Sequence, residues 1–144
     1  MTIEEILPHR KPFLFVDELH RADEQRIVGT YRFQHDDYFF QGHFPGYPVV
    51  PGVLLIELMA QIGGAGLGES GLLPPQAPFF LGAIEKAKFR HQIHPGDTAK
   101  VEIDNLRVTP RTVRQTGKVF VEDKLCAEAT WMCIVGERPP VPAN

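Results

Sequence analysis

One segment, residues 51–67, constrains the fold more than any other, because it predicts a single helix that is apolar on nearly every side. Between Val53 and Ala60 its only polar residue is Glu57. Pro51 suits the first helical turn, where a missing N–H costs nothing, and we expect the glycines at 63, 64, 66 and 68 to fray the far end. A helix that is apolar all round must be buried on all sides. The sequence therefore predicts a curved sheet wrapped around this helix.

Strand-like segments elsewhere in the chain can supply that sheet. Apolar residues alternate with charged ones from Ala99 to Asp104, which is the period-two pattern of a half-buried strand. A tight turn at 122–124 is expected to join the last two strands as a hairpin. The expected strands cover residues 12–19, 26–34, 79–89, 113–121 and 125–135, residues 97–135 as a whole are strand-like, and a turn region is expected at 91–97. Mostly antiparallel strands around one long helix make an α+β fold.

Size and charge exclude several classes of protein. The chain has 144 residues, which suits one domain, expected over residues 1–136 with a flexible Pro-rich tail at 137–144. Its longest apolar run is interrupted by proline, glycine and polar residues, so it is not expected to span a membrane. A net charge of −3 argues against nucleic-acid binding.

The cysteines and the N-terminus both point to the cytoplasm. Cys126 and Cys133 fall seven residues apart on one expected strand, too far apart to form a disulfide, so we expect buried free thiols. The first residues contain no apolar run of the kind that marks a secretory signal.

Glu57 is the first residue that points to chemistry. Its neighbours on the same helix face are Val53, Leu54, Ala60 and Gln61, so hydrocarbon is expected to surround it. A buried, unpaired carboxyl group keeps its proton and can then act as a general acid. A solvent-facing position, or pairing with a basic residue elsewhere, would also explain a single glutamate in a helix.

The segment before the helix adds a base and a donor. His43 lies in the Pro- and Gly-rich loop 41–48, which can hold a neutral imidazole near pH 7, although a loop histidine can equally be a structural partner of a backbone carbonyl. The free N–H groups at the helix start, near Gly52, can bind an oxygen that gains negative charge. An acid, a base and an oxyanion donor therefore lie within fifteen residues, and in a symmetric dimer the acid and the base can meet across the interface.

Other patterns carry less. His91 and His94 superficially resemble metal ligands, but with no third ligand nearby a surface turn is the better interpretation, and no metal is expected. The chain contains no dinucleotide-binding, phosphate-loop or nucleophile-elbow motif.

Several motifs together resemble a known family. They are Leu7–Leu14, Phe39–Gly46, the run from Pro51 through Glu57 to Gln61, Ile84–Arg90, Pro95–Asp97 and Ala127–Ala129. Over residues 6–135 the chain is similar to the (3R)-hydroxyacyl-acyl-carrier-protein dehydratases of bacterial type II fatty-acid synthesis. Glu at position 57 and Val at position 53 favour the dehydratase-only branch over the bifunctional dehydratase/isomerase, which has Asp and Cys there.

The resemblance implies a hot-dog fold, a homodimer with shared sites, and often a trimer of dimers. It implies that His43 takes the C2 proton, that Glu57 of the other subunit protonates or positions the departing C3 hydroxyl, and that the Gly52 N–H holds the thioester carbonyl. No cofactor is implied beyond the 4′-phosphopantetheine arm of acyl carrier protein that carries the substrate. The further candidates are Val53, Phe44 and Pro45 for substrate binding, Phe79 and Phe80 for gating an acyl tunnel, and Lys86, Lys88 and Arg90, with Arg10 and Lys11, for docking the acidic carrier protein.

Two other functions fit the same fold: a thioesterase or coenzyme-A-dependent hydratase, and a non-catalytic acyl-thioester sensor. A sensor would not need both His43 and Glu57, and a thioesterase would not need a clamped histidine loop. The shortness of the chain favours a dimer in any case, because 144 residues enclose a long acyl tunnel poorly, whereas two copies can build it between them.

Overall fold

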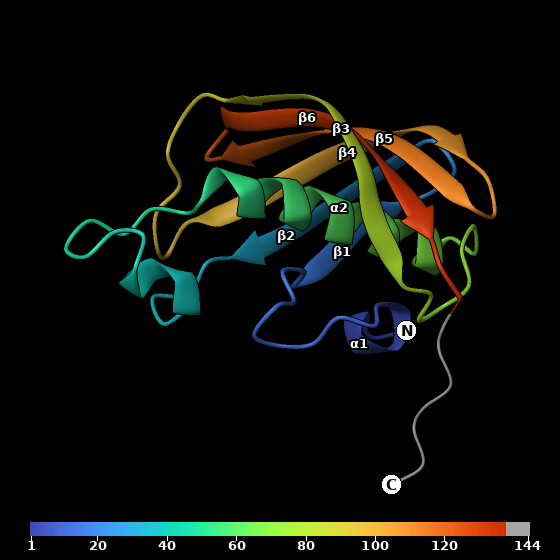
Figure 1. The fold of residues 1–144 in the computed structure, drawn as a ribbon, viewed down its shortest axis with the longest axis horizontal. Coiled ribbons are helices and arrows are strands. Elements are labelled where there is room, and N and C mark those ends of the chain that lie inside the picture. The colour runs from blue at the N-terminus through green and yellow to red at the C-terminus, as the bar shows by residue number, and fades with distance from the viewer. Residues whose placement is uncertain (138–144) are drawn as a thin grey trace, which may run out of the picture.

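The computed structural model describes residues 1–137 and shows a six-stranded antiparallel sheet curled over one long helix (Figure 1). The helix, α2, spans Gly52–Glu69. The strands are β1 (Glu18–Ala22), β2 (Arg26–Arg32), β3 (Phe79–Phe89), β4 (Thr98–Val108), β5 (Thr112–Val121) and β6 (Lys124–Val135). Their order across the sheet is β1-β2-β4-β5-β6-β3, so β3 is an edge strand although it comes third in the chain. The expected α+β, hot-dog architecture is confirmed.

Short elements and turns complete the fold. A helical turn, α1 (Ile3–Ile6), lies near the N-terminus, and a 3₁₀ turn, η1 (Tyr38–Gln41), precedes the histidine loop. The predicted hairpin between β5 and β6 is confirmed: Glu122 and Asp123 have φ of 49° and 66°, as a two-residue turn of that type requires. Apart from Glu137, the predicted tail 137–144 lies outside the described residues.

The predicted strand over residues 12–19 is wrong for most of its length. Only Glu18 and the residue after it join β1, and Leu14, Phe15 and Val16 are buried without belonging to the sheet. A side chain takes the place of a neighbouring strand: the Phe15 N–H donates to Oε1 of Gln61 at 2.7 Å, and Nε2 of Gln61 donates to the Phe13 carbonyl at 3.1 Å. The apolar pattern correctly predicted that residues of this segment are buried, but it did not predict that the backbone would bond to a side chain and not to another strand.

The glycines near the end of α2 do not fray it, contrary to the prediction, and the helix continues to Glu69. They lie where other elements approach the helix closely. A Cβ added at Gly66 would lie 2.5 Å from the Ile27 side chain, and one added at Gly64 would overlap the Phe79 ring. Close packing therefore offsets the cost of glycine in a helix, about 1 kcal/mol each.

Burial along α2 is uneven. Every residue from Leu58 to Gly68 is buried, as predicted for a wrapped helix. In the first two turns, however, the Val53 side chain is 73% exposed, and Leu54 and Glu57 are half-buried. The expectation that the sheet covers the whole helix is wrong here, because the sheet of one chain does not reach around this face.

Three further expectations concern the cysteines, membrane-spanning helices and metal ligands. Cys126 and Cys133 are free and buried, as predicted. Within residues 1–137, no helix is long and apolar enough to cross a membrane. The same part of the chain contains no group of three or more His, Cys, Asp or Glu side chains that could hold a metal ion.

Candidate active site

His43 is held in one orientation by the loop that precedes α2. Its Nδ1 lies 2.8 Å from the Val49 carbonyl oxygen, and the Val49 N–H donates back to the His43 carbonyl. A carbonyl oxygen can only accept, so Nδ1 carries the proton and Nε2 of the neutral ring keeps a lone pair. His43 can therefore be a hydrogen-bond partner of the Val49 carbonyl through Nδ1 and a base through Nε2 at the same time.

Neighbouring residues shape the surroundings of His43. The Phe44 ring stacks on the imidazole with a centroid distance of 4.1 Å, and the peptide bond between the two residues is cis. Phe44, Pro45 and Tyr47 are exposed, so the loop presents an apolar and aromatic surface beside the histidine.

The start of α2 offers backbone donors. No side chain caps the helix, and within the described residues the N–H groups of Gly52 and Val53 make no hydrogen bond. The space beside the Gly52 Cα is occupied by the Phe89 ring, which would lie 3.1 Å from an added Cβ. A side chain at position 52 would thus crowd the Phe89 ring, while the Gly52 N–H remains available to an oxygen.

The carboxyl group of Glu57 has polar partners, so it is not the unpaired carboxyl group among mainly hydrocarbon neighbours that we expected. Nε2 of Gln61 donates to its Oε2 at 2.9 Å, and Nε2 of His9 lies 3.8 Å from the same oxygen. On the inner side, burial and the Glu57 charge raise the pKa of the Cys133 thiol to about 12. Glu57 therefore lies at the border between the core and the open face of the helix, its side chain 21% exposed.

Sequence reasoning assigned no site role to His9 or Gln61. Gln61 carried a usable signal, because a polar residue four positions after Glu57 lies on the same helix face. His9 carried none, since it is 48 residues away from Glu57 along the chain and only the tertiary fold places it there.

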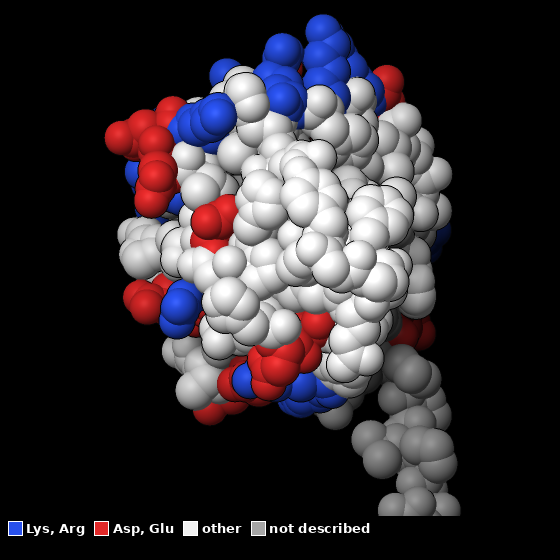
Figure 2. Space-filling model, turned by 90° about the vertical axis from the view of Figure 1, so that its left-hand side faces the viewer, with Lys and Arg blue, Asp and Glu red and all other residues white. Residues whose placement is uncertain are grey.

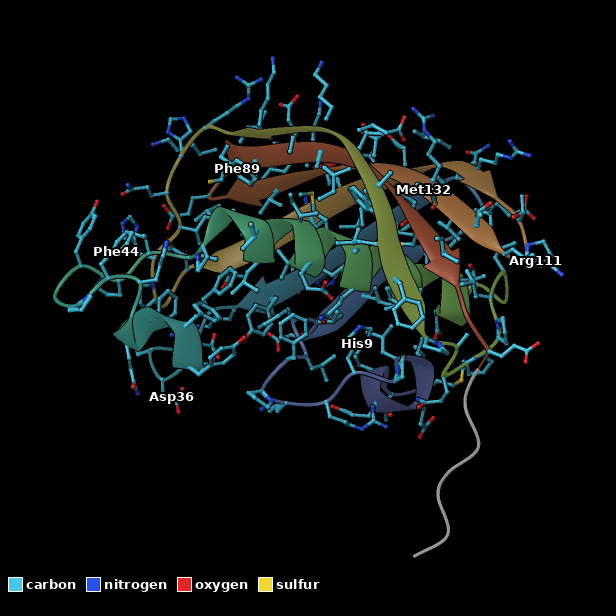
Figure 3. All side chains as sticks on the ribbon, in the orientation of Figure 1. His9, Asp36, Phe44, Phe89, Arg111 and Met132 are labelled. Carbon is cyan, nitrogen blue, oxygen red and sulfur yellow. The ribbon has the colours of Figure 1, made fainter. Side chains whose placement is uncertain are left out.

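The single chain does not bring the acid and the base together. No hydrogen bond or ion pair joins His43 to Glu57 anywhere in residues 1–137. Figure 3 shows Phe44, the neighbour of His43, at the end of the molecule beyond the start of α2, whereas His9, the neighbour of Glu57, lies below the middle of the helix.

The two candidate gate residues face opposite sides of the sheet. Phe79 points toward α2, where its ring packs over Gly64 and lies 5.2 Å from the His9 ring. Phe80 is 61% exposed and contacts Gly136 on the outer side. Only Phe79 lies between the sheet and the helix of this chain.

The candidate docking residues differ in whether their charged groups already have a partner in the chain. Lys86 and Lys88 are exposed on the outer face of β3, opposite Thr130 and Glu128. Arg90 pairs with Glu128, its Nε 3.1 Å from the carboxylate. Figure 2 shows Lys and Arg side chains gathered along the upper border of a broad uncharged face.

At the N-terminus, Arg10 donates to the carbonyls of Glu4, Leu7 and His9 and so holds the N-terminal segment together, with exposed Lys11 beside it. Its guanidinium is therefore less free than the ammonium groups of β3.

Comparison with known proteins agrees with this geometry. A FabA-like domain matches residues 7–130. The 3-hydroxyacyl-acyl-carrier-protein dehydratase FabZ of Desulforamulus reducens is 41% identical over 138 residues, which cover 95% of this chain and 96% of the relative. The enzyme of the same name from Koribacter versatilis is 43% identical over 145 residues, covering 99% and 92%.

Solved structures share the fold at low identity. The dehydratase heterocomplex ApeI:P from Xenorhabdus doucetiae matches with a TM-score of 0.81 at 12% identity, covering 96% of this chain and 93% of the other. A hypothetical thioesterase with coenzyme A from Streptococcus pneumoniae TIGR4 matches with a TM-score of 0.60 at 14% identity, covering 85% and 88%. At such identities the likeness concerns the fold alone.

A central helix wrapped by an antiparallel sheet, with a histidine loop at the helix start and a carboxyl group on the helix, defines a protein of the hot-dog class. Within that class the chain belongs to the FabA-like family, and its full-length relatives are FabZ dehydratases.

Proposed function

We propose that this protein is a hydro-lyase of fatty-acid elongation, which converts (3R)-hydroxyacyl-acyl-carrier-protein thioesters into trans-2-enoyl thioesters and water. The observation that carries the proposal is the orientation of His43, whose Nδ1 is tied to the Val49 carbonyl so that Nε2 is free to accept a proton. Membership of the FabA-like family and 41% identity to a FabZ dehydratase support the same reaction.

The residues divide the elimination between them. Nε2 of His43 takes the C2 proton, which the thioester makes acidic. The free N–H of Gly52 donates to the thioester oxygen as it gains negative charge. Glu57 protonates the C3 hydroxyl, the C3–O bond breaks, and the electron pair of the C2–H bond becomes the new double bond. Protons alone are exchanged, so we assign no cofactor and no metal.

We place the two halves of each site in two copies of the chain. The edge strand β3 has unpaired backbone groups along its free side, and its helix-facing residues Leu81, Ile84 and Phe89 are 39%, 49% and 51% exposed. A long apolar edge of this kind is a template for strand pairing. A second copy on β3 would cover these residues and the open face of α2, and would bring His43 of one chain toward Glu57 of the other. Assembly of such dimers into a trimer is part of the same proposal.

Mixing two inactive variants tests the shared site. His43→Ala and Glu57→Ala subunits are mixed in equal amounts and exchanged by partial unfolding and refolding. Half of the resulting dimers are heterodimers, and each heterodimer has one intact site and one inactive site. Random pairing restores about a quarter of wild-type activity. Complete failure of verified heterodimers to regain activity contradicts a site built across the interface.

The carrier protein is proposed to dock on the exposed ammonium groups of Lys86 and Lys88, since an acidic partner needs only a local basic surface. Replacing both by Glu raises KM for the carrier-protein substrate and leaves KM for the coenzyme A thioester nearly unchanged. Lys124→Glu, on another exposed lysine, is the matched control. Equal effects on both substrates contradict docking at Lys86 and Lys88.

The reaction itself is tested with 3-hydroxybutyryl-acyl-carrier-protein and with longer acyl chains, by following the ultraviolet absorbance of the conjugated enoyl thioester. A parallel thiol reagent measures release of the carrier thiol. Enoyl thioester without free thiol is the expected result. Free thiol without enoyl product would instead assign the protein as a thioesterase.

A further inference from the structure

His9 occupies an unassigned position beside the carboxyl group of Glu57. It reaches this position from the segment between α1 and β1, and its ring lies against Phe79 of β3. The His9 and Glu57 side chains are only 16% and 21% exposed, and the His9 Nε2 lies 3.8 Å from Oε2 of Glu57. Two groups this close, in a largely buried environment, affect each other's charge and position.

The surroundings of His9 determine its charge and the position of its proton. Burial lowers its pKa from the usual 6.5, Glu57 opposes this shift, and Arg10 adds to it, so the ring is neutral near pH 7. Nδ1 is buried and has no hydrogen-bond partner in the described part of the chain. A proton on Nδ1 would find no acceptor there, whereas a proton on Nε2 faces a carboxylate oxygen.

Gln61 approaches the same oxygen of Glu57 from the other side. Its amide is fully buried and fixed by the Phe13 carbonyl and the Phe15 N–H, so its position is determined by the core. Its Nε2 donates to Oε2 of Glu57 at 2.9 Å. Nε2 of Gln61 and Nε2 of His9 both point to Oε2 of Glu57, whereas Oε1 makes no hydrogen bond within residues 1–137.

We propose that His9 is a positioning residue for Glu57: with Gln61, it holds Oε2 so that Oε1 is directed to the substrate hydroxyl. The proposal rests on the proposed dehydration. The distance of 3.8 Å is too long for a hydrogen bond, but catalytic hydrogen bonds are often long without substrate and shorten in the complex.

A neutral imidazole suits this task better than a cation. A guanidinium or ammonium group beside Glu57 would stabilise the ionised carboxylate, so that a smaller share of Glu57 would carry the proton it has to donate. The neutral N–H of His9 can hold Oε2 without that effect. The same donor still favours the ionised form slightly, and this gives the proposal a measurable consequence.

Two substitutions separate positioning from packing. His9→Phe keeps a ring against Phe79 and removes the donor, and we expect kcat to fall by up to about a hundredfold with little change in KM, as a small displacement of a catalytic group produces. His9→Gln places an amide N–H near the position of Nε2 and should restore most of kcat. His20→Phe is the matched control, because His20 is exposed and bonds only Thr30.

The titration of Glu57 gives a readout that does not depend on activity. NMR of protein with ¹³C-labelled glutamate carboxyl groups should show the Glu57 titration at higher pH in His9→Phe than in the wild type, and no change in His20→Phe. The charged groups that act on His9 in this measurement are Glu57 on α2 and Arg10 beside it, and the protonated, uncharged thiol of Cys133 on β6 lies near Glu57.

The outcomes are distinct. The proposal is overturned if folded His9→Phe keeps the wild-type kcat and the wild-type Glu57 titration. It is also overturned if His9→Phe and His9→Gln lose kcat equally, both melt at a lower temperature, and the Glu57 titration does not shift. A wild-type protein that forms no enoyl product would refute the proposed function, while the titration would still report whether His9 acts on Glu57.

Discussion

The two parts of α2 have nearly the same apolar composition but different surroundings. From Leu58 to Gly68 every residue is buried, and the glycines admit side chains from the sheet and from the N-terminal segment. Over Gly52–Glu57 one face is open, the N–H groups of Gly52 and Val53 make no hydrogen bond within residues 1–137, and the carboxyl group of Glu57 lies at the border. The buried part stabilises the fold, and we propose that the open part is left for substrate and for a second copy of the chain.

The difference between the two parts has a physical cause. An apolar surface left exposed costs about 25 cal/mol for each Å² that could have been buried, so an apolar face such as that around Val53 indicates something that covers it. In the buried part the covering groups belong to the same chain. In the open part they do not, and we expect substitutions to separate the two roles.

The largest expected effect is on activity at the open end. His43→Ala and Glu57→Ala should each lower kcat by about 10²–10⁴-fold, because each removes a general acid or base. Both side chains are only partly buried, so the melting temperature should stay near that of the wild type. Activity assays and thermal unfolding on the same preparations test this. Near-native turnover by folded Glu57→Ala would show that the chemistry lies elsewhere.

A smaller effect, on stability, is expected at the buried end. In Gly66→Val the new side chain would meet Ile27, since even a Cβ would lie 2.5 Å from it, and the free energy of unfolding should fall by about 1–3 kcal/mol. Gly42→Ala is the control, because no atom lies within 4 Å of an added Cβ and φ is −103°. Urea unfolding of both variants measures the difference. Equal stabilities would mean that the buried part tolerates overpacking.

The smallest expected effect is a pH dependence at the border of the two parts. Because burial lowers the pKa of His9 below 6.5, the unfolded chain takes up a proton at higher pH than the folded chain does. This contribution to stability is present above pH 6.5 and is lost as the pH falls through the lower pKa of the folded state. The stability difference between the wild type and His9→Gln should therefore change in favour of the variant on acidification from pH 7.5 to 5. A difference independent of pH would contradict the lowered pKa.

Local patterns predicted most of the fold. The helix, the long strands and the hairpin follow from periodicity and turn chemistry, and β3 has the predicted bounds. The failures share one cause: in each, a distant group replaced a local one. Gln61 satisfies the backbone of the predicted strand at 12–19, and sheet side chains fill the space beside glycines that were expected to end the helix.

The sequence by itself determined the elements, the apolar helix with Glu57 in its first half, and the histidine loop ahead of it, because these depend on residues close together in the chain. Only the tertiary structure decided which face of the helix remains open, that Phe79 rather than Phe80 packs against the helix, and that His9 lies beside Glu57. Periodicity shows that a face must be covered, but the identity of the group that covers it depends on contacts between residues far apart in the chain.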